Sequence, residues 1–278
     1  MDSPNVAFKR IQSPSSINTY KLCPRKYFYT YVLELPTESN IHMIRGNVAH
    51  SALEHFFQIN INHIDEKKYE QQLKVAMQEL LIYHWKAAHE RFDKLKLSQE
   101  KLASYFEETL HMLIAWVDLF CKKVKATKKS FREAFEYLTP LVEQHFISNA
   151  YGVQGYVDAI EVQDGKIRIM DYKTSSKNEL TDEYLLQLAI YALLYHEKYN
   201  KFPDEAGVYL LQYGEKAIKV DNALLELAKR EVAQIHKNTQ SEEIEDYPLK
   251  PGPYCKWSTG QCDFYNICFG KKKINDFD

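Results

Sequence analysis

Apolar residues recur with a helical period through most of the first half of the chain. Within residues 45–59, for example, Val48 and Phe56 fall on one face of a helix together with other apolar residues between them. The same spacing predicts helices over residues 13–22, 66–90 and 98–124. The first half of the chain is therefore expected to be largely helical.

The pattern changes near Phe131, where short runs typical of strands replace the helical period. Gln163-Asp164-Gly165 predicts a tight turn, so the runs on either side of it are expected to form a hairpin. We predict strands over residues 141–147, 155–162, 166–173, 207–213 and 216–220, and helices over residues 181–199 and 222–237. The tail from Pro248 has no period and is expected to be rich in loops. This order predicts an α/β fold with a central mixed β-sheet flanked by helices, a helical N-terminal region and a C-terminal cysteine-rich lobe.

The composition is that of an ordinary globular chain. The 278 residues are 45% hydrophobic and 27% charged, which suits two domains or one large core with an appended lobe. The net charge is −2, so the molecule as a whole does not attract nucleic acid, and any such binding needs a local basic patch. The sequence has no apolar run long enough to span a membrane and no secretory signal, so we expect a cytoplasmic protein.

Three charged residues lie in strands that are otherwise apolar. Asp158 lies within one strand of the predicted hairpin, and Asp171 and Lys173 end the other. Side chains alternate along a strand, so Asp171 and Lys173 share one face about 6–7 Å apart, while Tyr172 points the other way. The hairpin can also bring Asp158 near Asp171, where two carboxylates repel each other unless a cation such as Mg²⁺ or Mn²⁺ lies between them. The alternative is a surface hairpin with a solvated Asp–Lys pair, but the apolar surroundings of both carboxylates argue against it.

Two further features fit such a site, although each is common when it occurs alone. His50 follows Gly46 by one helical turn, and a neutral imidazole is a frequent metal ligand. The glycine is expected to permit a close approach, whereas an ordinary exposed or hydrogen-bonded histidine remains the alternative for His50. Gln187 and Tyr191 are four residues apart, so they lie on one face of the predicted helix.

These features occur in the order that is typical of a known nuclease family. They are the segments GNVAH (46–50), GYVD (155–158), DYK (171–173) and QLAIY (187–191). From about Ser13 to its C-terminus, the chain resembles RecB-like nucleases of the PD-(D/E)XK superfamily. Glu143, on the strand before GYVD, matches a position where relatives often carry a glutamate.

The resemblance implies a role for each matching residue. The residues expected to hold Mg²⁺ or Mn²⁺ are His50, Asp158, Asp171 and Tyr172, the last through its carbonyl group. The residues expected to act in catalysis are Asp158, Asp171, Lys173, Gln187 and Tyr191. Lys173 would orient or activate water, and the glutamine and tyrosine would steady the site or the nucleic-acid strand.

The implied reaction is metal-dependent hydrolysis of phosphodiester bonds. We expect a DNA exonuclease that acts on single strands or DNA ends, with partners in recombination, repair, phage replication or CRISPR adaptation. One alternative is a catalytically silent subunit that binds nucleic acid for assembly, and another is a zinc-stabilised structural protein. The intact Asp158, Asp171 and Lys173 argue against the silent subunit, which has no need of charges in apolar strands.

Four of the five cysteines lie near the two ends of the sequence: Cys23, Cys255, Cys262 and Cys268. This set is similar to that of AddB-type subunits and CRISPR-associated exonucleases, which implies that the four thiolates bind a [4Fe–4S] cluster. Many relatives have two residues between the first two C-terminal cysteines, whereas this chain has six between Cys255 and Cys262. Zn²⁺ and unligated thiols remain alternatives, because four thiolates also suit zinc. Cys121 is expected to be a buried apolar residue of a helix.

The resemblance implies a single nuclease domain over residues 1–278. Its expected parts are a helical insertion (60–130), the nuclease core (131–240) and a cluster-binding lobe (13–31 with 248–270).

The densest basic run comprises Lys122, Lys123, Lys125, Lys128, Lys129 and Arg132. A solvated helix end is its ordinary interpretation, although a nuclease of this net charge needs some basic track for phosphates. Arg25, Lys26 and 271–273 add positive charge beside the expected cluster lobe. The aromatic residues Tyr27, Phe28, Tyr29 and Tyr31 could either stack on bases or pack in the core.

Overall fold

A five-stranded mixed sheet organises the chain in the computed structural model, which describes residues 8–175, 178–258 and 260–270; the predicted basic residues 271–273 lie outside the described residues. The strands are β1 (Leu141–Ser148), β2 (Val153–Gln163), β3 (Lys166–Lys173), β4 (Glu205–Leu210) and β5 (Gly214–Lys219), in the order β1-β2-β3-β4-β5. The pairs β2–β3 and β4–β5 are antiparallel, whereas β3–β4 is parallel. The predicted central mixed sheet is therefore confirmed.

The chain divides into two compact units. Unit 1 contains residues 8–38, 147–155 and the described part of 222–270, and unit 2 contains residues 39–146 and the described part of 156–221. The sheet belongs to unit 2 apart from the adjoining ends of β1 and β2.

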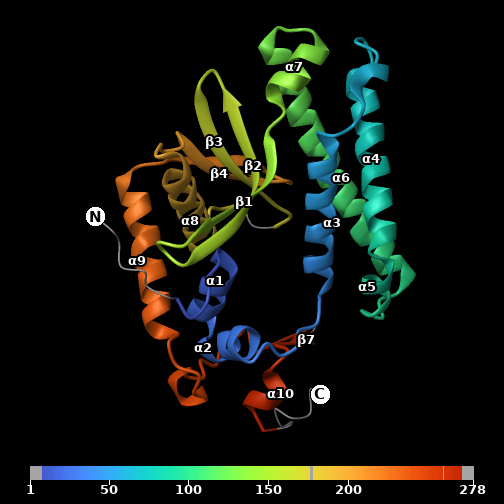
Figure 1. Ribbon diagram of the computed structural model, residues 1–278. Helices are drawn as coiled ribbons and strands as arrows, with labels where there is room; N and C mark the ends of the chain where they lie inside the picture. The colour runs from blue at the N-terminus through green and yellow to red at the C-terminus, as the bar shows by residue number, and fades with distance from the viewer. Residues whose placement is uncertain (1–7, 176–177, 259, 271–278) are drawn as a thin grey trace. The chain divides into compact units, whose positions relative to one another are not determined.

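In unit 2, three helices pack side by side and form the main apolar core (Figure 1). They are α3 (Ile41–Phe56), α4 (Tyr69–Ala87) and α6 (Gln99–Thr127), accompanied by the short segments η2 (Ile61–His63) and α5 (His89–Asp93). Phe56 of α3 packs edge-on against Trp116 of α6, with 5.1 Å between ring centroids. This confirms the predicted helical N-terminal region.

One helix of unit 2 differs from the sequence prediction. The apolar pattern predicts that the helical region ends near Phe131, but the structure has a further helix, α7 (Phe131–Leu138). It begins with a capping box, in which the Ser130 hydroxyl accepts from the Glu133 backbone N–H and the Glu133 carboxylate accepts from the Ser130 backbone N–H. A capping box satisfies orphan backbone groups locally, so it can support a helix too short to show a clear period.

The hairpin that carries the charged strand residues has a two-residue turn. Asp164 and Gly165 both have positive φ angles, 51° and 77°, as a type I′ turn requires. Gln163 therefore pairs with Lys166, and Ala159 pairs with Met170 farther along. This register places Asp158 and Asp171 at neighbouring positions of adjacent strands. The second predicted hairpin also forms, but β4 ends at Leu210 because residues 211–213 turn into β5.

The helix α8 (Asp182–Tyr199) packs against β3 and β4 (Figure 1). Its first turn is capped by the Thr181 hydroxyl, which accepts from the Tyr184 backbone N–H. On β3, the Tyr172 ring instead joins the core of the α3, α4 and α6 helices. The opposite environments of Tyr172 and its neighbours are those expected from strand alternation.

Unit 1 contains the helices α1 (Pro14–Leu22), α2 (Pro24–Tyr27) and α9 (Asn222–Asn238), with the π-helical turn η1 (Phe28–Val32). Its C-terminal part contains η3 (Ile244–Asp246), β6 (Lys256–Trp257), β7 (Gly260–Gln261) and α10 (Tyr265–Cys268), so the tail is mostly loop with very short elements. Lys21 of α1 forms an ion pair of 2.7 Å with Glu231 of α9. None of the described helices has both the length and the apolar character that a membrane span needs.

Candidate active site

A cavity of about 560 Å³ in unit 2 collects most of the charged residues that the sequence predicts for the site. Its lining residues come from α3, from the strands β1, β2 and β3, and from Thr174 directly after β3. Its lining comprises Met43, Gly46, Asn47, His50, Ser51, Glu54, Glu143, Asp158, Tyr172, Lys173 and Thr174. A Cβ atom at Gly46 would meet only Thr174 Oγ1, at 3.8 Å, so packing within the protein does not require glycine there.

Three of these residues are arranged as potential metal ligands. One ligand atom each from His50, Glu143 and Asp158 lies within 4.8 Å of the other two. Asp158 Oδ2 is 3.3 Å from His50 Nδ1 and also accepts a hydrogen bond of 2.7 Å from the Tyr172 backbone N–H. Glu143 is held in a left-handed conformation with a φ angle of 48°, which is uncommon for a residue other than glycine. An imidazole and two carboxylates form a donor set suited to Mn²⁺ or Mg²⁺.

Asp171 is the most deeply buried carboxylate of the site, with only 1% of its surface exposed. Its Oδ2 forms an ion pair of 2.5 Å with Lys173 Nζ and has no further polar partner in the described part of the chain. Its Oδ1 accepts a hydrogen bond of 2.8 Å from the Gln187 side-chain amide. The same amide donates to the Tyr191 hydroxyl at 2.7 Å, so α8 supplies a polar support beneath the carboxylate.

The pKa values of the site reflect an excess of negative charge. Burial raises the pKa of Asp171 to about 6; Lys173 opposes this shift and Asp158 adds to it. Burial also raises the pKa of Glu143 to about 6, with further contributions from Asp158 and Glu54. For His50, burial lowers the pKa, but the Asp158 carboxylate outweighs this and raises it to about 9.

We use the name cavity carboxylates for Glu143 and Asp158, which line the cavity, together with Asp171, which pairs with the lining residue Lys173. Among the described residues, Lys173 pairs with Asp171, and His50, whose raised pKa favours its charged form, pairs with Asp158. These two cations do not balance three carboxylates. Buried carboxylates in this number require a cation or protons. A divalent metal ion therefore fits the site.

A model of the PD-(D/E)XK nuclease superfamily matches residues 12–269. The chain belongs to this superfamily. Nucleases of this superfamily use divalent metals such as Mg²⁺, in agreement with the donor set of the cavity.

Two curated relatives are phage proteins that match parts of the chain. The Gene 69 protein of Mycobacterium phage D29 is 37% identical over 75 residues, which are 26% of this chain and 26% of that protein. The Gene 69 protein of Mycobacterium phage L5 is 33% identical over 107 residues, which are 38% of this chain and 31% of that protein. The matched segments thus span about a quarter to a third of the length of these relatives.

The fold also resembles a solved structure from a bacterium. The crystal structure of an exonuclease candidate from Eubacterium rectale superposes with a TM-score of 0.50, covering 96% of this chain and 90% of that one. The sequence identity is 11%, so this likeness concerns the fold alone.

Within this PD-(D/E)XK chain, the structure brings most of the predicted site residues together. The predicted residues that contact one another are His50 with Asp158, Asp171 with Lys173 and Gln187, and Gln187 with Tyr191. The Tyr172 ring faces the helices, 6.1 Å from the Trp116 ring between centroids. The predicted ligand set and the structural group share His50 and Asp158, whereas Glu143 rather than Asp171 lies within 4.8 Å of both.

One acidic residue of the cavity escaped the sequence reasoning. Glu54 lines the cavity one turn after His50 on α3, and its charge contributes to the raised pKa of Glu143. Its position four residues after His50 could have indicated this, because residues i and i+4 lie on the same face of a helix.

The four terminal cysteines line one cavity of about 180 Å³ in unit 1. Burial raises the pKa of the Cys268 thiol to about 11, and the neighbouring thiols of Cys262, Cys23 and Cys255 contribute to the increase. Their convergence agrees with the expected set of four. Cys121 is buried in α6, as predicted.

Several residues that could contact nucleic acid are already paired or buried within the protein. In the basic run, Lys123 is paired with Glu161 and Glu215, and Lys125 is paired with Glu70. The rings of Tyr27, Phe28 and Tyr29 are buried, which supports their core interpretation.

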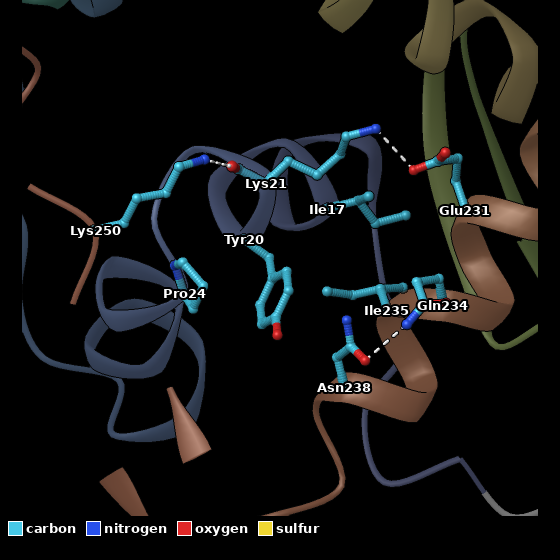
Figure 2. A pocket seen from close by; sticks show the side chains of 9 residues that line it. All are labelled: Ile17, Tyr20, Lys21, Pro24, Glu231, Gln234, Ile235, Asn238 and Lys250. Carbon is cyan, nitrogen blue, oxygen red and sulfur yellow. Dashed lines mark hydrogen bonds and ion pairs between the residues drawn. The ribbon is translucent and has the colours of Figure 1, made fainter. Parts of the chain in front are cut away.

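Another pocket lies between α1 and α9 of unit 1, with a volume of about 190 Å³ (Figure 2). Its charged side chains already have partners, because Lys21 pairs with Glu231 and the Lys250 ammonium group donates to the Lys21 carbonyl oxygen. The pocket thus lacks the charge imbalance of the cavity in unit 2.

Proposed function

We propose that this PD-(D/E)XK nuclease is a metal-dependent DNA exonuclease that acts on single strands or DNA ends. The observation that carries the proposal is the charge imbalance of the cavity carboxylates beside Lys173. His50, Glu143 and Asp158 would hold Mg²⁺ or Mn²⁺, with Asp171 and the Tyr172 carbonyl group as the further ligands implied by the family. When bound, the metal would lower the pKa of water and offset charge on the transition state.

The side chains around the metal would position the reacting groups. Lys173 has a raised pKa because Asp171 outweighs the effect of burial, so its ammonium group stays charged near a phosphate. A charged ammonium group can orient water or stabilise a developing negative charge. Gln187 would fix the orientation of Asp171, and Tyr191 would hold the glutamine amide.

The cysteine-lined cavity of unit 1 suits a [4Fe–4S] cluster held by Cys23, Cys255, Cys262 and Cys268. A tetrahedral zinc site brings its sulfur atoms to within about 4 Å of one another. Four thiolates suit either centre, and the family resemblance of the cysteine set favours the cluster. The terminal segments 13–31 and 248–270 would then act as a cluster-binding lobe of a single nuclease domain.

The likeness to two phage proteins favours a setting in phage replication or recombination over the other pathways considered. A catalytically silent assembly subunit is the competing function. It would retain DNA binding without cleavage, and the unbalanced carboxylates argue against it.

The test is a cleavage assay on end-labelled single-stranded and double-stranded DNA with Mg²⁺, Mn²⁺ or EDTA. We expect metal-dependent shortening from an end, faster on single strands, and no cleavage in EDTA. Cleavage that continues in EDTA, or no cleavage under any condition, would contradict the proposal.

For the cluster, the test is anaerobic purification followed by iron, sulfide and zinc analysis. The expected result is iron with sulfide in the parent and a loss of both in Cys23→Ser, whereas Cys121→Ser keeps them. A colourless protein with one zinc would favour the zinc alternative.

A further inference from the structure

Two exposed aromatic side chains stack on each other beside the cavity. His145 of β1 and Tyr156 of β2 have ring centroids 4.2 Å apart and nearly parallel rings, at an interplanar angle of 8°. Tyr156 remains 56% exposed, and His145 is also exposed. Both residues belong to unit 2. His145 covers one face of the Tyr156 ring, and the ring, which remains 56% exposed, is accessible from its other side.

The position of this His145–Tyr156 pair relates it directly to the site. Glu143 lies two residues before His145 on β1, and Asp158 lies two residues after Tyr156 on the neighbouring strand β2. The ligand atoms of Glu143 and Asp158 lie within 4.8 Å of each other, so both pairs of residues bridge the same two strands. Two residues of a strand span about 7 Å, so the rings lie one nucleotide or less from the carboxylates.

We propose that the His145–Tyr156 pair is a stacking platform for a base of single-stranded DNA next to the scissile phosphate. This proposal rests on the proposed nuclease function and specifies the substrate class of the same site. The faces of unpaired bases are accessible and stack on aromatic rings with little dependence on sequence. Bases within a duplex are already stacked on their neighbours, so the platform selects single strands or frayed ends.

The test measures the binding of fluorescent single-stranded DNA by anisotropy in EDTA, which prevents metal-dependent cleavage. Tyr156→Ala should weaken binding on the order of 5- to 100-fold, the usual effect of removing one stacking ring. Tyr156→Phe should bind like the parent, because the ring is kept. With a strand that lacks the terminal bases at both ends, all three proteins should bind equally.

The chain offers a matched control on α4. Tyr83 is 67% exposed and also neighbours a histidine, but its ring meets that of His84 edge-on, at 84° with 5.1 Å between centroids. Tyr83→Ala should therefore leave binding of single strands unchanged.

Three results would overturn the proposal. One is equal binding by Tyr156→Ala and the parent, including the case in which neither binds single strands. Another is an equal loss by Tyr156→Ala on the intact strand and on the strand without terminal bases. The third is a changed oligomeric state of Tyr156→Ala with unchanged binding, which would assign the rings to a protein interface.

Cleavage assays on the same proteins separate this proposal from the nuclease function. A parent protein that shows Tyr156-dependent binding but no metal-dependent cleavage would contradict the nuclease function alone. A parent protein that cleaves DNA, with binding independent of Tyr156, would contradict the stacking platform alone.

Discussion

Two groups of three carboxylates lie on or beside the same sheet, and they differ in how their charges are balanced. In the Arg168 cluster, the guanidinium group is 2.7 Å from Glu161, 2.7 Å from Glu205 and 2.9 Å from Glu215. Lys123 adds ion pairs with Glu161 and Glu215 at 3.4 and 3.3 Å. Every carboxylate of this cluster thus has a cationic partner from the protein itself.

The cavity carboxylates are arranged differently. Asp171 pairs with Lys173, and Asp158 pairs with His50. Glu143 lies near both Asp158, which raises its pKa, and His50, which lowers it. The comparison indicates that a balanced cluster stabilises the fold, while an unbalanced one keeps a position for a cation. The two clusters should therefore respond in opposite ways to mutation, pH and metal.

The largest expected effect is on cleavage. Asp171→Asn and Lys173→Ala should each lower kcat by on the order of 100-fold or more, because the proposed mechanism uses Asp171 to hold the metal and Lys173 to stabilise the reacting groups. Asp171→Asn should also unfold at a temperature no lower than the parent, since it relieves repulsion within the cavity. The measurement is steady-state cleavage together with thermal unfolding, and near-parental cleavage by both variants would remove the residues from the mechanism.

The next effect concerns stability and belongs to the Arg168 cluster. Arg168→Met removes the closest ion pair of the buried Glu161 and leaves it with Lys123 and the Tyr209 hydroxyl, so it should lower the free energy of unfolding by roughly 3 kcal/mol. Chemical denaturation measures this change, and the cleavage rate per folded molecule should stay near that of the parent. A stable but inactive Arg168→Met protein would place this cluster in the chemistry and break the comparison.

The pH dependence of stability should have opposite signs in the two clusters. Glu143 and Asp171 have pKa values raised to about 6, so the metal-free folded protein holds protons that the unfolded chain loses near pH 4. Their contribution to stability therefore falls as the pH rises from about 4 to 6. For Glu215, burial raises the pKa, but Lys123 and Arg168 outweigh it and lower the value, so its contribution is lost as the pH falls.

Thermal unfolding in EDTA from about pH 3 to pH 7, with Asp171→Asn and Glu215→Gln, measures the two signs separately, because the Glu215 contribution changes below about pH 4.5. Relative to the parent, Asp171→Asn should gain stability with rising pH, and Glu215→Gln should lose it. The same sign in both variants would show that the clusters do not differ in the way described.

The sequence predicted the parts of the site that depend on local pattern. The strand that carries Asp171 and Lys173 has the predicted bounds, because alternation and the Asp164-Gly165 turn both act within a few residues. The approach of Glu143 to His50 joins residues almost a hundred positions apart and uses a left-handed residue within a strand, which no periodicity reveals. The stacking of His145 on Tyr156 likewise depends on strand register.

The smallest expected effect concerns Glu54, an acidic residue of the cavity lining. Glu54→Gln removes one contribution to the raised pKa of Glu143, so it should lower that pKa and weaken Mn²⁺ binding only a few-fold. A titration at low and high salt should show that the difference shrinks with salt, because screening reduces such effects. A loss as large as that of a direct ligand would place Glu54 among the ligands.

The most direct test of the account is a calorimetric titration of Mn²⁺ into the parent, Asp158→Asn and Glu205→Gln. Glu205 is the matched control, because it is a carboxylate of the balanced Arg168 cluster. The account predicts that the parent binds Mn²⁺, that Asp158→Asn binds it at least about 10-fold more weakly, and that Glu205→Gln is unchanged. Equal affinity in the parent and Asp158→Asn, or a loss confined to Glu205→Gln, would contradict it.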